Sequence, residues 1–166
     1  SILSRKAETE IELADGQNPW EIRHWATDAV KHRRPGYSIL RNDAAFPISK
    51  LSEMVDFCHA TADGHGIMMH TFGHVGMGLL HALMLARPDN DEEWCAAQKV
   101  NELIIRKAIE LDGTISGEHG IGLAHKQIFE ESHAPILELM RKIKLQFDPR
   151  NILNPGKIFD MERSRG

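Results

Sequence analysis

The chain has 166 residues, of which 42% are hydrophobic and 27% are charged, and its formal net charge is −4. This length and composition are typical of one globular domain that can bury a real core. The acidic balance leaves no dominant basic face, which argues against nucleic acid as a partner, and no apolar run approaches the ~20 residues of a transmembrane helix.

Prolines and glycines divide the first half of the chain into helical and extended segments. Apolar residues recur at helical spacing before Pro35-Gly36, and Pro47 stops a strand candidate. Ser49 is a suitable N-cap for the helix that follows. These signals predict helices over residues 1–15 and 20–32, a strand over 37–46, and a helix that closes at residues 63–64.

The second half alternates in the same way. An acidic run at residues 89–93 suits the positive end of a long helix, and Pro135 suits the first turn of the last helix. The apolar face of that last helix consists of Ile136, Leu139, Met140, Ile143 and Phe147. The expected elements are strands over 67–74 and 81–85, a helix over 89–111, a short strand over 114–116, and helices over 123–131 and 135–147. Few short strands among helices favour an α+β domain, with helices packed on a mostly antiparallel sheet.

The two cysteines, Cys58 and Cys95, lie far apart and lack the spacing of a metal motif. We expect both to be small buried hydrophobic residues in a reducing compartment. The N-terminus has no apolar core of a signal peptide, so a cytoplasmic location is expected.

Histidines are concentrated in the middle of the chain. Five of the ten lie between His59 and His81. His74 and His81 are seven residues apart, and two strands joined by a glycine-rich turn can bring them together. Two neutral imidazoles are a good start for a Zn or Fe(II) site, which needs a third ligand. The alternative is a pair of hydrogen-bonded polar residues at strand ends.

A second candidate segment runs from Ser116 to Gly122. Its adjacent Glu118 and His119 lie between glycines that let the backbone approach a ligand closely. Glu118 can be the third metal ligand, and His119 can be a general base beside the metal. The alternative is a simple strand-to-helix turn with Glu118 near a helix N-terminus. The order of the glycines is not that of a dinucleotide-binding fingerprint.

Three ordered segments resemble the C-terminal domain of FAD-linked oxidases, a family that includes glycolate oxidase, D-lactate dehydrogenase and D-2-hydroxyglutarate dehydrogenase. The segments are residues 73–81, residues 112–122 and residues 147–158. The resemblance extends upstream to Trp20 and covers nearly the whole chain. It implies a single domain over residues 1–166, the substrate and metal half of an FAD-dependent oxidoreductase of small D-2-hydroxy acids, with the flavin-binding N-terminal domain absent from this chain.

The resemblance also implies roles for individual residues. His74, His81 and Glu118 would bind Zn or Fe, and this metal would polarise the 2-hydroxyl of the substrate. His119 resembles the base that takes the hydroxyl proton while hydride leaves C2 for the flavin. Three further residues match the positions that bind the substrate carboxylate, and three match the flavin contacts. These are Arg23, Thr27 and Arg41 for the substrate, and Asn154, Gly156 and Lys157 for FAD.

The chain departs from the family pattern between the two histidines. The family commonly has Asp and Asn where this chain has Met77 and Leu79, which cannot make the same hydrogen bonds. A second interpretation is therefore a non-catalytic remnant or interaction subunit that retains the fold. A third is a metallohydrolase that uses the same three ligands with water.

The expected partners are a small 2-hydroxy acid, an FAD-binding domain or subunit, and possible further copies of the chain. The face that meets the flavin domain should be exposed and partly apolar. Because the chain has no nucleotide-binding motif, we expect that alone it neither holds flavin tightly nor turns over substrate.

Overall fold

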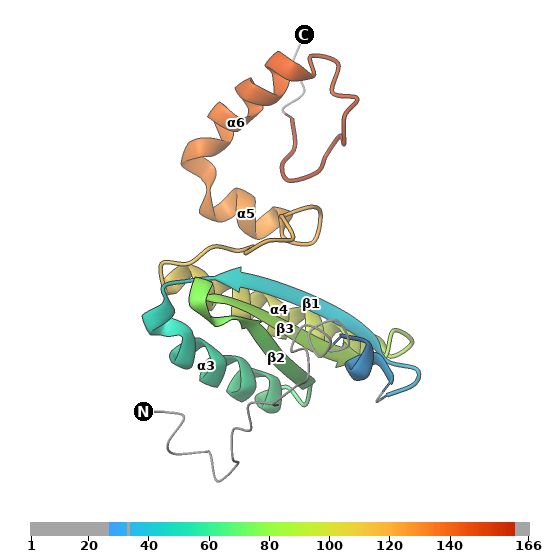
Figure 1. The fold of residues 1–166 in the computed structure, drawn as a ribbon. Helices are drawn as coiled ribbons and strands as arrows, with labels where there is room; N and C mark the ends of the chain where they lie inside the picture. Colours follow the sequence, from blue (N-terminus) through green and yellow to red (C-terminus); the bar gives the residue numbers. More distant parts are fainter. Residues whose placement is uncertain (1–26, 33, 162–166) are drawn as a thin grey trace, which may run out of the picture.

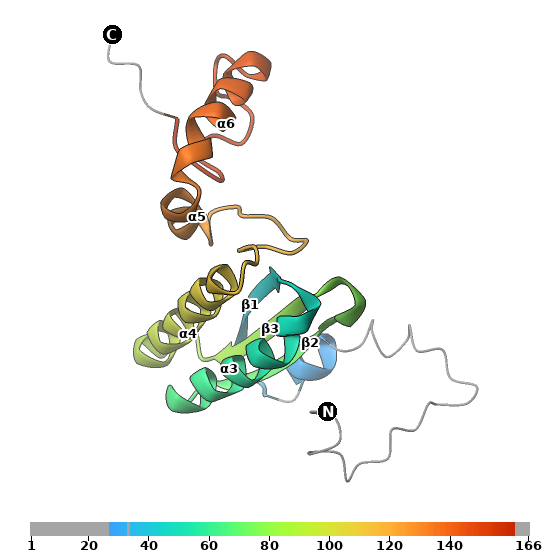
Figure 2. The same cartoon turned by 90° about the vertical axis from the view of Figure 1, so that its left-hand side faces the viewer.

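The computed structural model describes residues 27–32 and 34–161. Its centre is a sheet of three antiparallel strands in the order β1-β3-β2. The strands are β1 (Ser38–Ala45), β2 (Met68–His74) and β3 (Leu79–Ala86). Two helices, α3 (Leu51–Gly64) and α4 (Asp91–Glu110), pack against one face of the sheet, as Figures 1 and 2 show. The expected α+β class, with helices on an antiparallel sheet, is confirmed.

The central strand β3 has a neighbour on each side. All of its residues are buried, so its side chains are covered on both faces of the sheet. Alternate residues of a strand point to opposite faces, so Leu80, Ala82 and Met84 enter the core under α3 and α4. His81, between them, points to the other face. Helical residues 27–32 lie on that other side of the sheet in both views (Figures 1 and 2).

The C-terminal part of the structure lies beyond one end of the sheet (Figure 1). It contains α5 (Lys126–Ser132) and α6 (Ala134–Phe147), followed by an irregular tail. A second apolar cluster holds these helices, and Ile105 of α4 and Ile115 belong to it. No helix in the described ranges is both long and apolar enough to cross a membrane.

The order of the predicted elements is confirmed over the described residues, with several corrections. Ser49 lies in a short 3-10 helix (Ile48–Lys50), and α3 begins after Lys50 without a side-chain cap. Residues 114–116 do not form a strand, since only Thr114 makes an isolated bridge to Ala45. α5 begins three residues later than expected. The helix predicted over 1–15 lies outside the described residues. So does the first part, residues 20–26, of the helix predicted over 20–32.

One burial prediction was wrong, and one correctly identified apolar face lies exposed. Cys58 is buried as expected, but Cys95 is exposed on α4. In α6 the predicted apolar face points mostly to solvent, and the buried residue is Leu137, which that face did not include. The helical periodicity identified the apolar face correctly, but this face lacks a partner among the described residues.

Candidate metal centre

The face of the sheet opposite α3 and α4 carries the polar residues that the sequence singled out. Asp43 of β1 is in register with His81 of β3, which is in register with Phe72 of β2. His74 lies two residues after Phe72 on β2, opposite Leu79. The turn between His74 and His81 contains a 3-10 helix (Val75–Met77). The structure therefore brings together two histidines that are seven residues apart in the sequence.

Glycine makes this turn possible. Gly78 has φ of 65°, which favours glycine, and a Cβ there would lie 2.0 Å from the carbonyl oxygen of Phe46. A Cβ on Gly73 would lie 2.1 Å from the carbonyl oxygen of Leu79. Gly78 thus lets the turn pack against Phe46, just after β1, and Gly73 lets β2 and β3 approach closely beside His74.

Glu118 completes the group from a distant part of the sequence. It lies in the segment between α4 and α5, which crosses the end of the sheet (Figure 1). Its Oε1 is 3.1 Å from Nε2 of His81 and 3.8 Å from Nε2 of His74. One potential ligand atom from each of His74, His81 and Glu118 lies within 4.8 Å of the other two. We call these three residues the ligand triad.

The triad is closed on one side and open on the other. The side chain of His81 is 9% exposed, whereas those of His74 and Glu118 are 30% and 43% exposed. Burial lowers the pKa of His81 because desolvation disfavours the imidazolium, although the charge of Glu118 acts in the opposite direction. A neutral imidazole is the form that binds a metal ion. An open side leaves room for a further ligand, as in catalytic zinc sites.

His119 lies beside the triad. Its ring centroid is 5.3 Å from that of His81, and its Nε2 is 3.8 Å from Oε1 of Glu118. The other ring nitrogen, Nδ1, is 3.4 Å from Oδ1 of Asp43. With 60% of its side chain exposed, His119 can reach a molecule that enters from the open side.

Asp43 is a site residue to which sequence reasoning gave no role. Burial alone would raise the pKa of Asp43, but hydrogen bonds from the backbone N–H groups of Glu118 and His119 lower it below the usual range. The available signal was its place two residues after Arg41 on one strand, since such residues share a face. Only the fold shows that this face meets Glu118.

The predicted substrate residues are placed unequally. Arg41 is exposed on β1. It is two residues from Asp43, so both lie on the face of the sheet that carries the triad. Thr27 is half-buried in the helical segment 27–32. Arg23 lies outside the described residues.

The predicted flavin contacts lie in the tail after α6. Asn154 and Lys157 are exposed, and the carbonyl oxygen of Gly156 accepts a hydrogen bond from Nζ of Lys126 at 3.1 Å. Asp148 shapes this tail, since its carboxylate accepts hydrogen bonds from the backbone N–H groups of Ile152 and Leu153. The tail runs alongside α6, away from the sheet (Figures 1 and 2).

A hydrogen bond and the second apolar cluster bring the end of the tail back toward the segment that carries Glu118. The N–H of Ile158 donates to the carbonyl oxygen of Gly122 at 2.9 Å. The structure thus connects the tail to the segment that carries Glu118, but it does not bring Asn154, Gly156 or Lys157 to the triad.

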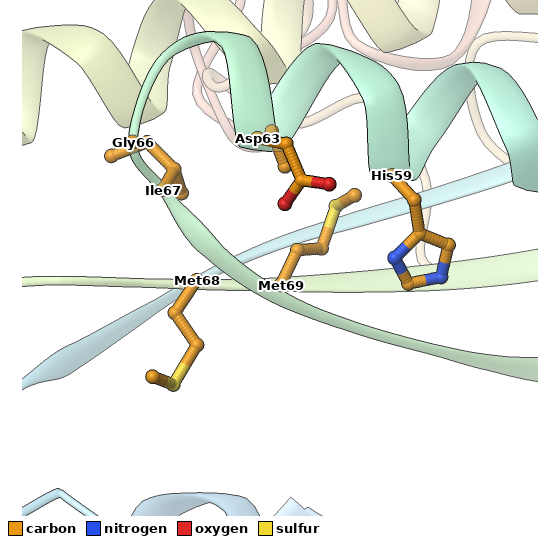
Figure 3. A pocket seen from close by; sticks show the side chains of 7 residues that line it. His59, Asp63, Gly66, Ile67, Met68 and Met69 are labelled. Carbon is orange, nitrogen blue, oxygen red and sulfur yellow. The ribbon is translucent and has the colours of Figure 1, made fainter.

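A hollow of about 400 Å³ at the other end of α3 is a poor alternative to the triad as a metal site. Its lining includes His59 and Asp63 of α3, together with Met68 and Met69 (Figure 3). Nε2 of His59 already bonds to Oγ1 of Thr71 at 3.0 Å. Met68 points away from the two polar side chains (Figure 3), so the lining does not converge on one point.

Residues 4–158 match the family model for the C-terminal domain of FAD linked oxidases. Because this match covers most of the chain, the chain belongs to that family.

Named relatives agree with this assignment. The chain is 34% identical over 146 residues to the probable mitochondrial D-lactate dehydrogenase of Danio rerio, covering 87% of the chain and 29% of that protein. It is 38% identical over 148 residues to the glycolate oxidase subunit GlcD of Bacillus subtilis, covering 84% of the chain and 29% of that protein. The chain thus spans less than a third of the length of these relatives.

A solved structure shares the fold at low sequence identity. The 4-ethylphenol oxidase of Gulosibacter chungangensis, solved as an isoeugenol complex, matches with a TM-score of 0.60 and 18% identity. The match covers 84% of this chain and 28% of that one. At this identity the similarity supports the fold and no particular substrate.

Proposed function

We propose that this chain is the substrate and metal half of an FAD-dependent dehydrogenase of small D-2-hydroxy acids such as D-lactate or glycolate. The observation that carries the proposal is the convergence of His74, His81 and Glu118, from two strands and a distant loop, on one point. The family membership of the chain and its relatives among D-lactate dehydrogenases and glycolate oxidases support the same substrate class.

The residues of the triad fit a divalent metal. Two imidazoles and one carboxylate are ligands that Zn and Fe(II) accept, and the partly exposed side leaves a coordination position free. Bound there, the ion would act as a Lewis acid on the substrate hydroxyl, and FAD from the other domain would accept the electrons.

We assign the remaining functions to residues outside the triad. His119, beside the triad and open to solvent, takes the proton of the substrate hydroxyl. Arg41 provides a guanidinium that can hold the substrate carboxylate in a bidentate contact, with Arg23 and Thr27 proposed to assist. Asn154, Gly156 and Lys157 are proposed to contact the flavin from the tail. The cytoplasmic location stays a prediction.

Replacing Arg41 with Ala should raise KM for the hydroxy acid by roughly 10–100-fold and change kcat little, because a hydrogen bond to a charged group is lost. Steady-state kinetics of the intact flavoprotein measure this. Replacing Arg150, an exposed arginine of the tail, is the control and should leave KM unchanged. An unaltered KM in the Arg41 variant would exclude the carboxylate role.

The partner surface that we propose is the exposed apolar face of α6. Ile136, Leu139, Ile143 and Phe147 recur at helical spacing and are 47%, 60%, 50% and 82% exposed. A patch of this kind marks an interface. Because relatives extend more than three times the length of this chain, we assign the flavin-binding domain as the occupant, in preference to a second copy of the chain.

Replacing both Leu139 and Ile143 with Lys should lower the FAD content of the intact protein at least several-fold. Charges on the apolar face of α6 would weaken its contact with the flavin-binding domain. The absorbance ratio of flavin to protein after gel filtration measures this. Glu138→Lys, on a polar part of α6, should retain full FAD content. A change in oligomeric state with unchanged FAD content would instead assign the face to self-association.

The overall function is tested by anaerobic addition of D-lactate, glycolate or D-2-hydroxyglutarate to the intact, FAD-loaded protein. Bleaching of the flavin band by one of these acids, together with about one metal ion per chain, is the expected result. Bleaching without metal would contradict the role of the triad.

A second candidate is a metal-binding subunit without catalysis. Leu79 is 3% exposed and packs against Gly117 of the Glu118 segment, where its side chain offers no hydrogen bond. Met77 is 74% exposed on the turn. A protein that binds metal and FAD but is not bleached by any of the three acids would favour this candidate.

A further inference from the structure

Asp43 is a buried carboxylate of β1 that contacts the loop carrying Glu118. It is 2% exposed. Its Oδ2 accepts hydrogen bonds from the N–H of Glu118 at 2.5 Å and the N–H of His119 at 3.0 Å. Its Oδ1 accepts one from Oγ of Ser116 at 3.4 Å. Both oxygens of Asp43 are therefore engaged with a loop that lies more than 70 residues away in the sequence.

The backbone of Asp43 strengthens the same attachment. Its carbonyl oxygen accepts a hydrogen bond from the N–H of Gly117 at 3.3 Å. Ser116 extends the network, because its Oγ accepts the N–H of Gly120 at 2.8 Å. One residue of β1 thus holds four consecutive residues of the loop, directly from 116 to 119.

The end of the loop is held by the hydrogen bond from Ile158 to Gly122, and Asp43 holds its middle. The loop contains three glycines, at 117, 120 and 122, so it loses much conformational entropy when it becomes ordered. A Cβ on Gly117 would lie 2.7 Å from Cδ1 of Leu79, which shows how closely the loop sits on the sheet. The hydrogen bonds to the charged carboxylate are the strong ones in this contact.

Asp43 also connects the loop to the strand that carries a ligand. Asp43 is directly opposite His81 in the antiparallel register. The backbone of Glu118 is therefore held at a fixed place relative to His81, and the side chains of these residues approach to 3.1 Å. Asp43 is not in the group of atoms that converge on the proposed ion.

We propose that Asp43 is a positioning residue that sets the metal affinity of the triad by fastening the Glu118-His119 backbone to the sheet. The metal part of this inference rests on the proposed function, whereas the fastening of the loop does not. Residues outside the ligand shell that orient ligands typically change metal affinity by 10–100-fold when they are replaced.

The first experiment uses amide hydrogen exchange in the metal-free 166-residue chain. The N–H groups of Glu118 and His119 should be protected in the unchanged chain and should exchange at least 10-fold faster in Asp43→Asn. In Asp43→Ala, which removes both side-chain acceptors and leaves only the backbone carbonyl oxygen, the acceleration should be larger. The amides of α4 report whether each variant is still folded. Asp56→Asn, at an exposed position of α3, is the charge-matched control and should change neither amide.

The second experiment titrates the same chains with Co²⁺ and follows its visible absorption, which reports ligand geometry. Asp43→Asn should raise the Kd for Co²⁺ by roughly 10–100-fold, whereas Asp56→Asn should stay within about twofold of the unchanged chain. The α4 amides should stay as protected as in the unchanged chain. A general loss of stability would instead make these amides exchange faster.

Each outcome decides the inference. Unprotected Glu118 and His119 amides in the unchanged chain would overturn the fastening without any variant. Faster exchange with an unchanged Kd would overturn the effect on metal affinity. If the unchanged chain does not bind Co²⁺, the proposed metal function fails together with the affinity claim, and the exchange data still decide the fastening of the loop.

Discussion

Replacing Glu118 with Gln is expected to weaken metal binding by roughly 100-fold or more. The amide has the same shape but no charge, and it removes the one carboxylate of the ligand triad. Changes outside the ligand shell already cost 10–100-fold, so the loss of a direct ligand should cost at least as much. Metal analysis after dialysis, and titration with Zn²⁺ or Co²⁺, measure the effect.

A matched control is Glu138→Gln on α6, where the glutamate is exposed and pairs with Lys142. It should retain full metal content. If the Glu118 variant binds metal as tightly as the unchanged chain, the ion either does not bind at the triad or does not need its carboxylate, and the proposed function loses its main support.

Replacing His119 with Ala should lower kcat of the intact flavoprotein by roughly 10²–10⁴-fold, which is the usual contribution of a general base. Metal content should stay normal, because the imidazole lies beside the three converging ligand atoms and is not among them. Rapid-reaction measurement of flavin bleaching, with metal analysis of the same sample, tests both halves of the prediction.

His65→Ala is the control for His119, since His65 is an exposed histidine at the end of α3. It should leave both kcat and metal content unchanged. Loss of metal in the His119 variant would make this residue a ligand, and an unchanged kcat would remove it from the chemistry altogether.

The local pattern of residues was enough to predict most of the elements. The break at residues 63–64 predicted where α3 ends, and the acidic run at residues 89–93 predicted the start of α4, where Asn90 accepts a hydrogen bond from the N–H of Glu93. These signals depend on neighbours within one or two turns, so they do not need the rest of the fold. Periodicity could not show that the apolar face of α6 lacks a partner in the described structure, because the burial of a face depends on what packs against it.

The sequence by itself determined the residue types of the site, namely two histidines seven apart and an adjacent Glu118-His119 pair between glycines. It also determined the family, because those motifs appear in order along the chain. Only the tertiary structure decided that the side chains meet. The antiparallel register places Asp43 beside His81, and hydrogen bonds from the distant loop then bring Glu118 to the same point. These contacts join residues more than 30 positions apart, and distances across a fold depend on how strands pair, which no local pattern specifies.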